Sequence, residues 1–402
     1  MPGVVKLICP HCSLSRDIPA DAIPPGAKQA TCPRCRQTFP LPEEAAPLSH
    51  AGGAALPKAE TLRFSFNGTA RDYFGIWIVN TLLKIVTVGF YTAWAKVRKR
   101  CFFYGSTTLH GEPFDYLASP MALFKGWLIA ATAFILYLIG TKVSPVLSMV
   151  IALIVFIAFP WLVVRSRVFN AVNSSYRNIR FGFRRNYRQA YEVFAGLMIL
   201  AMLSFGLVIP YMIFRQKKFL VENSSYGATP FTFSASAKEF YLIAAKVAIG
   251  VTVIIGLIFL LIGVQGAAAF ADFPVGKELK GLALLPIFAF PLVYFLLVVY
   301  AQTEMANLAW NSTRLGVHRF RSTLRTRDMA LLFVTNALAI MVSLGLLMPW
   351  ATVRLARYRF EHLELLSIGG LDELHAGSDA AGVGAAGEEI SDLFDMPVEI
   401  AL

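Results

Sequence analysis

The stretch TVGFYTAWAKVRKR (Thr87–Arg100) closes an apolar run that begins at Tyr73, and it combines an internal glycine with four cations at its end. Related segments of about forty residues begin at Arg63, Arg180 and Arg319. They align without gaps and share a glycine, an aromatic residue and an arginine: Gly89, Trp94 and Arg98; Gly206, Tyr211 and Arg215; Gly345, Trp350 and Arg354. This agreement in register predicts three internal repeats.

A break in the helix is expected at each of these glycines. In the second and third segments a proline, Pro210 or Pro349, follows four residues later. Glycine adopts backbone angles that other residues resist, and proline removes a helix hydrogen bond. Each segment is therefore expected to be a Gly/Pro-broken unit.

The composition indicates a membrane protein. Of 402 residues 56% are hydrophobic and 15% are charged, and the mean hydropathy is +0.58. Seven apolar blocks approach the length of about 20 residues that a membrane helix needs. They lie near 75–93, 122–141, 145–164, 192–214, 240–270, 281–301 and 330–350.

The distribution of cations favours four crossings over seven. If the three repeated segments enter and leave on the same face, one face carries 23 Lys and Arg and the other carries 3. Seven crossings give a far more even split. Because Lys and Arg accumulate on the cytoplasmic side, we expect 122–141, 145–164, 240–270 and 281–301 to cross.

Two CxxC pairs near the N-terminus, Cys9/Cys12 and Cys32/Cys35, are separated by nineteen residues, which is the spacing of a zinc site. Four thiolates complete a tetrahedral sphere, so the predicted Zn²⁺ is structural. A disulfide or a redox dithiol fits a cytosolic segment less well. The stretch also resembles short bacterial zinc ribbons over residues 5–40, and that resemblance implies protein binding.

These patterns predict a mainly α, polytopic membrane fold in which three broken units flank two long helix pairs, plus a small N-terminal β zinc ribbon. The stretches LHGEPFDY (109–116) and YGATPFTF (226–233), which follow the first two units, are expected to be strands or turns. The predicted domains are a ribbon (1–40), a flexible linker (41–60), a membrane domain (61–366) and a disordered acidic tail (367–402). All 37 Lys and Arg precede residue 360, whereas ten acids follow it. No cleavable signal is expected, because the first forty residues are polar and rich in proline.

The motifs of the first repeat resemble the YjgN family of bacterial inner-membrane proteins, a domain of unknown function. The resemblance spans roughly residues 60–365 and implies an integral inner-membrane protein without a known activity. It rests on F-x-F-x-G, T-x-G-x-Y-x-x-W-x-x-x-R and G-x-x-F patterns at Phe64, Phe66, Gly68, Thr87, Gly89, Tyr91, Trp94, Arg98, Gly111 and Phe114.

The sequence does not favour an enzyme or a nucleic-acid-binding protein. Its six histidines are scattered, no phosphate loop or nucleophile elbow is present, and the basic residues flank apolar blocks as expected of contacts with a lipid bilayer. One hypothesis is a transporter or channel with broken helices. The alternative is a membrane scaffold or sensor whose ribbon and tail, both cytoplasmic, bind a cytosolic protein.

Overall fold

The computed structural model describes residues 4–8, 15–19, 29–32, 35, 37–40, 59–270 and 285–368. The chain divides into two compact units, Met1–Lys58 and Ala59–Leu402. In the smaller unit two antiparallel hairpins pair β1 (Val4–Ile8) with β2 (Ser15–Pro19) and β3 (Gln29–Thr31) with β4 (Thr38–Pro40). The linker and the acidic tail lie almost entirely outside the described residues, and the four-domain division stays a prediction.

The larger unit is built on a closed antiparallel β-barrel. Each strand pairs with the next one along the chain, and the last strand, β14, pairs with the first, β5. The barrel strands are β5 (Ala59–Phe66), β6 (Thr107–Leu109), β7 (Glu112–Tyr116), β8 (Ser174–Tyr176), β9 (Ile179–Phe183), β10 (Ser224–Tyr226), β11 (Thr229–Phe233), β12 (Thr313–Leu315), β13 (His318–Ser322) and β14 (Leu363–Ile368).

The barrel shows that the predicted fold class was wrong: the described residues are mostly helical, but ten strands of the membrane domain also form a closed β-barrel, which a mainly α fold with a small zinc ribbon does not contain. Four of the strands are only three residues long. Pairs of neighbouring strands are also separated in sequence by long helices. No continuous run of residues therefore carries enough alternation of apolar and polar side chains to reveal a sheet.

Five helix pairs connect the barrel strands in the described part of the chain. Three pairs are short: α1 (Ala70–Val86) with α2 (Thr92–Ser106); α5 (Tyr187–Ala190), the π-helix η3 (Tyr191–Gly196) and α6 (Leu197–Leu203) with α7 (Ile209–Glu222); and α11 (Thr326–Val342) with α12 (Met348–Glu361). Two pairs are long: α3 (Pro120–Val143) with α4 (Pro145–Val172), and α8 (Ala237–Phe270) with α10 (Leu285–Asn311).

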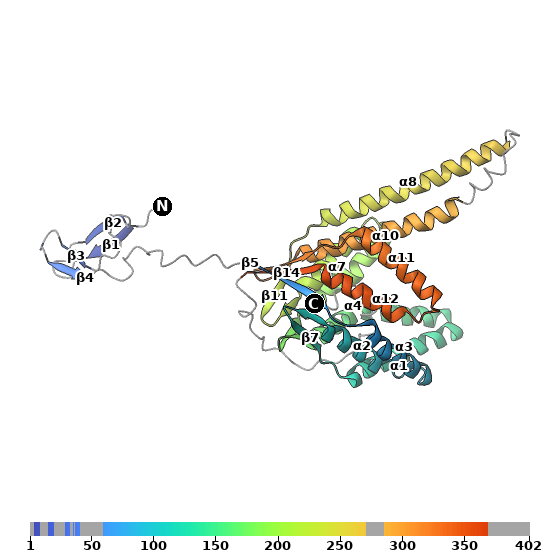
Figure 1. Ribbon diagram of the computed structural model, residues 1–402, viewed down its shortest axis with the longest axis horizontal. Coiled ribbons are helices and arrows are strands. Elements are labelled where there is room, and N and C mark those ends of the chain that lie inside the picture. Colours follow the sequence, from blue (N-terminus) through green and yellow to red (C-terminus); the bar gives the residue numbers. More distant parts are fainter. Residues whose placement is uncertain are drawn as a thin grey trace. The chain divides into compact units, whose positions relative to one another are not determined.

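All five helix pairs leave the barrel at the same rim (Figure 1). This follows from the topology, because strands that alternate in direction place the helix connections at one end and the two-residue hairpin turns at the other. Residues with positive φ form those turns: His110 and Gly111, Arg177 and Asn178, Gly227, and Gly316. Both the start of β5 and the end of β14 lie at the rim opposite the helices.

Each helix pair is closed at the barrel by an equivalent backbone hydrogen bond. The residue that follows a barrel strand donates its N–H to the carbonyl of the residue that immediately precedes the next strand, at the end of the returning helix, at 2.7–3.0 Å. The five donor–acceptor pairs are Asn67 and Ser106, Leu117 and Asn173, Arg184 and Asn223, Ser234 and Ser312, and Thr323 and His362. Both ends of every pair are thus fixed to the barrel.

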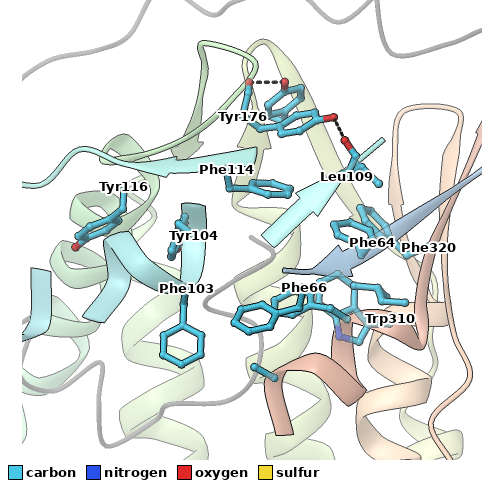
Figure 2. Packing of buried hydrophobic residues seen from close by; sticks show 14 of the residues in the cluster. Phe64, Phe66, Phe103, Tyr104, Leu109, Phe114, Tyr116, Tyr176, Trp310 and Phe320 are labelled. Atoms are coloured by element: carbon cyan, nitrogen blue, oxygen red, sulfur yellow. Dashed lines mark hydrogen bonds between the residues drawn. The ribbon is translucent and has the colours of Figure 1, made fainter. Parts of the chain in front are cut away.

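Aromatic side chains fill the barrel, as Figure 2 shows. The rings of Phe64 (β5) and Phe114 (β7) stack at 6.2 Å although β6 separates their strands, which places them across the interior. Two hydroxyls also cross it: Tyr176 donates to the Leu109 carbonyl and Tyr226 to the Tyr176 carbonyl, both at 2.8 Å. Burial raises the pKa of both tyrosines.

Helix ends close the barrel at the rim that carries the helices. Phe360 of α12 stacks on Phe64 and Phe66, and Trp310 of α10 packs against Phe320. Phe103 of α2 contacts Phe66 as well. The strands and the helices thus share one aromatic core.

Four helices are long and apolar enough to cross a membrane: Pro120–Val143, Pro145–Val172, Ala237–Leu260 and Phe290–Asn311. Only 6–17% of their most apolar windows is buried within the protein. The main contacts of α3 are with α2 and α4, and those of α8 are with α7 and α10. Most of the long-helix surface is therefore left for lipid.

Candidate functional site

The predicted zinc ligands belong to the segments that join the strands of the small unit. Cys32 is buried and Cys35 is half-buried, both between β3 and β4, and the Cys32 N–H donates to the Gln37 carbonyl at 2.9 Å. Cys9 and Cys12 lie between β1 and β2 in sequence, outside the described residues. A cysteine set carried by two hairpin turns fits Zn²⁺ chemically. No group of three metal-binding side chains occurs among the described residues, which include only half of this set.

The three predicted breaks are tight turns between the helices of each short pair. Gly89, Gly206 and Gly345 have φ of +89°, +86° and +91°. The residue before each glycine also has positive φ and is almost fully exposed: Val88 at 85%, Phe205 at 98% and Leu344 at 94%. Each short pair therefore ends in an apolar tip far from the barrel.

Pro210 and Pro349 do not break a helix. Each is buried at the start of the returning helix, α7 or α12. Proline suits the first turn, where its missing N–H would have no helical partner. These two residues therefore begin the second helix, and the glycines make the turn.

The aromatic residues and arginines of the three segments do not converge. Trp94 packs on Tyr91 and Phe124, and Tyr211 packs on Phe214. The Arg354 guanidinium lies 5.1 Å from the Trp350 ring centre. Arg98 is exposed and Arg215 is half-buried. Among the described residues these contacts stay within one helix pair or reach the next, so they form no common site.

Two buried asparagines were missed by the sequence analysis. Asn80 and Asn336 occupy equivalent positions in the first and third segments. Each donates from Nδ2 to a carbonyl of the opposite helix, Ala95 at 3.4 Å and Ala351 at 3.2 Å. The Arg354 guanidinium donates to Asn336 Oδ1 at 3.2 Å. The signal was present in the self-alignment, because a polar residue recurs there within an apolar helix.

Two hollows lie among the described helices of the larger unit. An open groove of about 350 Å³ lies between α11 and α12, and its lining includes Asp328, Arg354, Arg357, Tyr358 and Glu361. Since cations and carboxylates share this groove, charge alone selects no ligand for it. A second, smaller recess of about 20 Å³ lies between α4, η3 and α7.

Curated relatives match about a third of the chain. The inner membrane protein YjgN of Salmonella typhimurium LT2 is 31% identical over 147 residues, which is 36% of this chain and 36% of that protein. YjgN of Escherichia coli O157:H7 is 27% identical over 146 residues, which is 36% of this chain and 37% of that protein. The match therefore spans about a third of the length of these relatives. No solved structure matches.

Family comparisons cover far more of the chain. A zinc-ribbon domain matches residues 6–40, the segment that holds both CxxC pairs. The family described as bacterial protein of unknown function (DUF898) matches residues 61–393. This range includes every helix pair and the whole barrel except the first two residues of β5. The resemblance suggested by the motifs of the first segment is thereby confirmed, and the chain belongs to the DUF898 family.

Proposed function

We propose that this chain is an inner-membrane protein whose barrel stands at the cytoplasmic surface, with two long helix pairs crossing the bilayer. The name of its YjgN relatives and the exposed apolar surface of the four long helices support this arrangement. The two rims of the barrel then have different roles. One faces the membrane, and the other faces the cytoplasm with the linker and the tail.

In this arrangement the three short pairs dip into one leaflet. Arg98, Arg215 and Arg354 each stand six residues into the returning helix, about 9 Å from its tip at 1.5 Å per residue. Interfacial helices bury their apolar face to a similar depth of about 5–10 Å. The arginines would thus lie among lipid headgroups while the tips enter the acyl region.

The three short pairs are best explained as internal repeats. Their glycines adopt nearly the same positive φ, and each pair closes on the barrel with an equivalent hydrogen bond. The long pairs close in the same way. We propose that all five are variants of one hairpin-and-helix-pair unit, two of them extended to cross the membrane.

For the activity of the protein, we propose a docking platform rather than a transporter. The filled barrel supports this choice, because a solute path along the barrel would have to pass through stacked aromatic rings. Each long pair contacts mainly short pairs and not the other long pair. The binding elements would be a zinc ribbon, held by Cys9, Cys12, Cys32 and Cys35 around a structural Zn²⁺, and the acidic tail.

Crosslinking in cells tests the docking role. We expect a cytosolic protein to crosslink to the wild-type chain and to be lost when Cys32→Ser and Cys35→Ser are combined, because the zinc fold would be lost. Cys101→Ser is the matched control, since this cysteine belongs to α2 and should not affect binding. Solute flux through liposomes that contain the double variant, without any ribbon-dependent partner, would instead support transport.

Cysteine labelling tests the membrane arrangement, in a Cys101→Ser background. A membrane-impermeant maleimide should label Ser144→Cys, between α3 and α4, in intact cells. It should label Val317→Cys, in the β12–β13 turn, only after the inner membrane is permeabilised. Labelling of both positions in intact cells would contradict a cytoplasmic barrel.

A further inference from the structure

The small recess between α4, η3 and α7 is lined by two cations. Lys217 of α7 and Arg167 of α4 face it together with Gln216, and apolar residues such as Val163 and Phe194 complete its wall. Arg167 and Lys217 stand six residues before Asn173 and Asn223, whose carbonyls bond to the barrel, so both lie about 9 Å from the rim. Two positive charges therefore lie side by side at the same distance from the barrel rim.

Lys217 has no oxygen partner in the described part of the chain. Only 7% of the residue is exposed, and among the described residues none forms a hydrogen bond or ion pair with its ammonium group. Its main electrostatic neighbour is Arg167, which repels it. Burying a charge without a partner is costly, so such a group normally finds an oxygen.

The aligned position in the first repeat shows what is missing. Arg100 corresponds to Lys217, and its guanidinium donates to Asn170 Oδ1 at 2.7 Å and to the Tyr116 hydroxyl at 2.8 Å. At the position of Tyr116 the second repeat has Phe233, which carries no oxygen. Arg100 is thus held by oxygens of the strand and helix that follow its own helix, whereas Lys217 faces the preceding helix α4 and has no such partner among the described residues.

The helix opposite Lys217 is altered at the same place. The π-helix η3 interrupts the first helix of the second unit and contributes Phe194 to the recess, whereas α1 and α11 run without interruption. Such π-helical turns often occur at functional sites. Four residues toward the tip from the lining residues Phe194 and Ile213, the apolar residues Met198 and Ile209 are each 44% exposed.

We propose that this recess binds an anionic phosphoryl group, with one oxygen entering between Lys217 and Arg167. A recess of about 20 Å³ holds one water-sized atom, so the rest of the group would stay at its mouth. Gln216 can donate a further hydrogen bond. Burial lowers the pKa of Lys217 to about 8, and a bound anion would restore its charge. The phosphoryl group can belong to a phospholipid, whose chains fit the apolar surface above, or to free phosphate.

Thermal unfolding of the full chain in a non-phospholipid detergent tests the site. The probes are dioctanoyl phosphatidylglycerol and, at equal concentration and ionic strength, inorganic phosphate. We expect at least one probe to raise the melting temperature of the wild type. Lys217→Met should weaken the apparent affinity of the protein for that probe roughly tenfold or more, because a charge-assisted hydrogen bond is lost. A response to the lipid alone identifies a headgroup site, and an equal response to both probes identifies a site for free phosphate.

Lys218→Met is the matched control. Lys218 is the next residue on α7, but it is partly exposed and lies 3.8 Å from Glu222, so its loss should leave the response to the probe unchanged. The proposal is overturned if neither probe stabilises the wild type, or if Lys217→Met responds as strongly as the wild type. The cysteine labelling described above does not involve Lys217, so a failure of the membrane arrangement would be recognised separately.

Discussion

At the scale of single residues, the glycines of the turns carry the conformation of the short pairs. Gly345 has φ of +91°, and an added Cβ would meet nothing within 4 Å. Gly345→Ala should therefore destabilise the protein by about 1 kcal/mol or more through backbone strain alone. Gly75 is equally open but lies within α1, so Gly75→Ala should stabilise by about 0.5–1 kcal/mol. Thermal unfolding of both variants checks these opposite signs, and an equal effect would argue against a glycine-specific turn.

A second residue-scale prediction concerns pH. Lys217 has a pKa of about 8 in the folded protein and about 10.5 when unfolded. The unfolded chain therefore binds more protons between these values, and stability should rise with pH across that window. From pH 7.5 to 9.5, without added anion, the gain is about 2 kcal/mol by the linkage relation. Lys217→Met should lose most of this slope, and an unchanged slope would show that another group produces it.

At the scale of elements, apolar runs and glycines predicted the helices and their turns, but the barrel could not be predicted. Four strands have three residues each, and a helix pair separates each of them from one of its two pairing partners. The F-x-F entry motif at Phe64 and Phe66 is the alternating, inward face of β5. Short local patterns of this kind indicate a strand but not its neighbours.

Of the two candidate sites, one could be predicted from the sequence and the other could not. The two CxxC pairs could be read from spacing alone, because the chemistry of zinc fixes it. The recess could not, since Lys217 and Arg167 are fifty residues apart and meet only because two helix pairs share a barrel rim. A lysine among the cations of α7 looks like an ordinary membrane-surface charge until its burial is known.

At the scale of the whole molecule, the first and last strands of the larger unit's barrel pair with each other. β14 pairs with β5 over five residues, from Glu364 with Arg63 to Ile368 with Ala59. An ion pair between Arg63 and Glu364 at 3.3 Å spans the same junction, although the exposure of Arg63 makes its contribution small. Closure of the barrel thus depends on a strand more than 250 residues from its partner.

Truncation tests this dependence. A chain that ends after Glu361 lacks β14, which leaves β13 and β5 with unpaired edges and removes the buried Leu363 and Leu365 from the core. It should lose cooperative thermal unfolding and accumulate poorly in the membrane. A chain that ends after Ile368 keeps every barrel strand and should unfold at nearly the wild-type temperature. If the two truncations behave alike, the final strand does not close the fold and the helix pairs alone must hold the unit together.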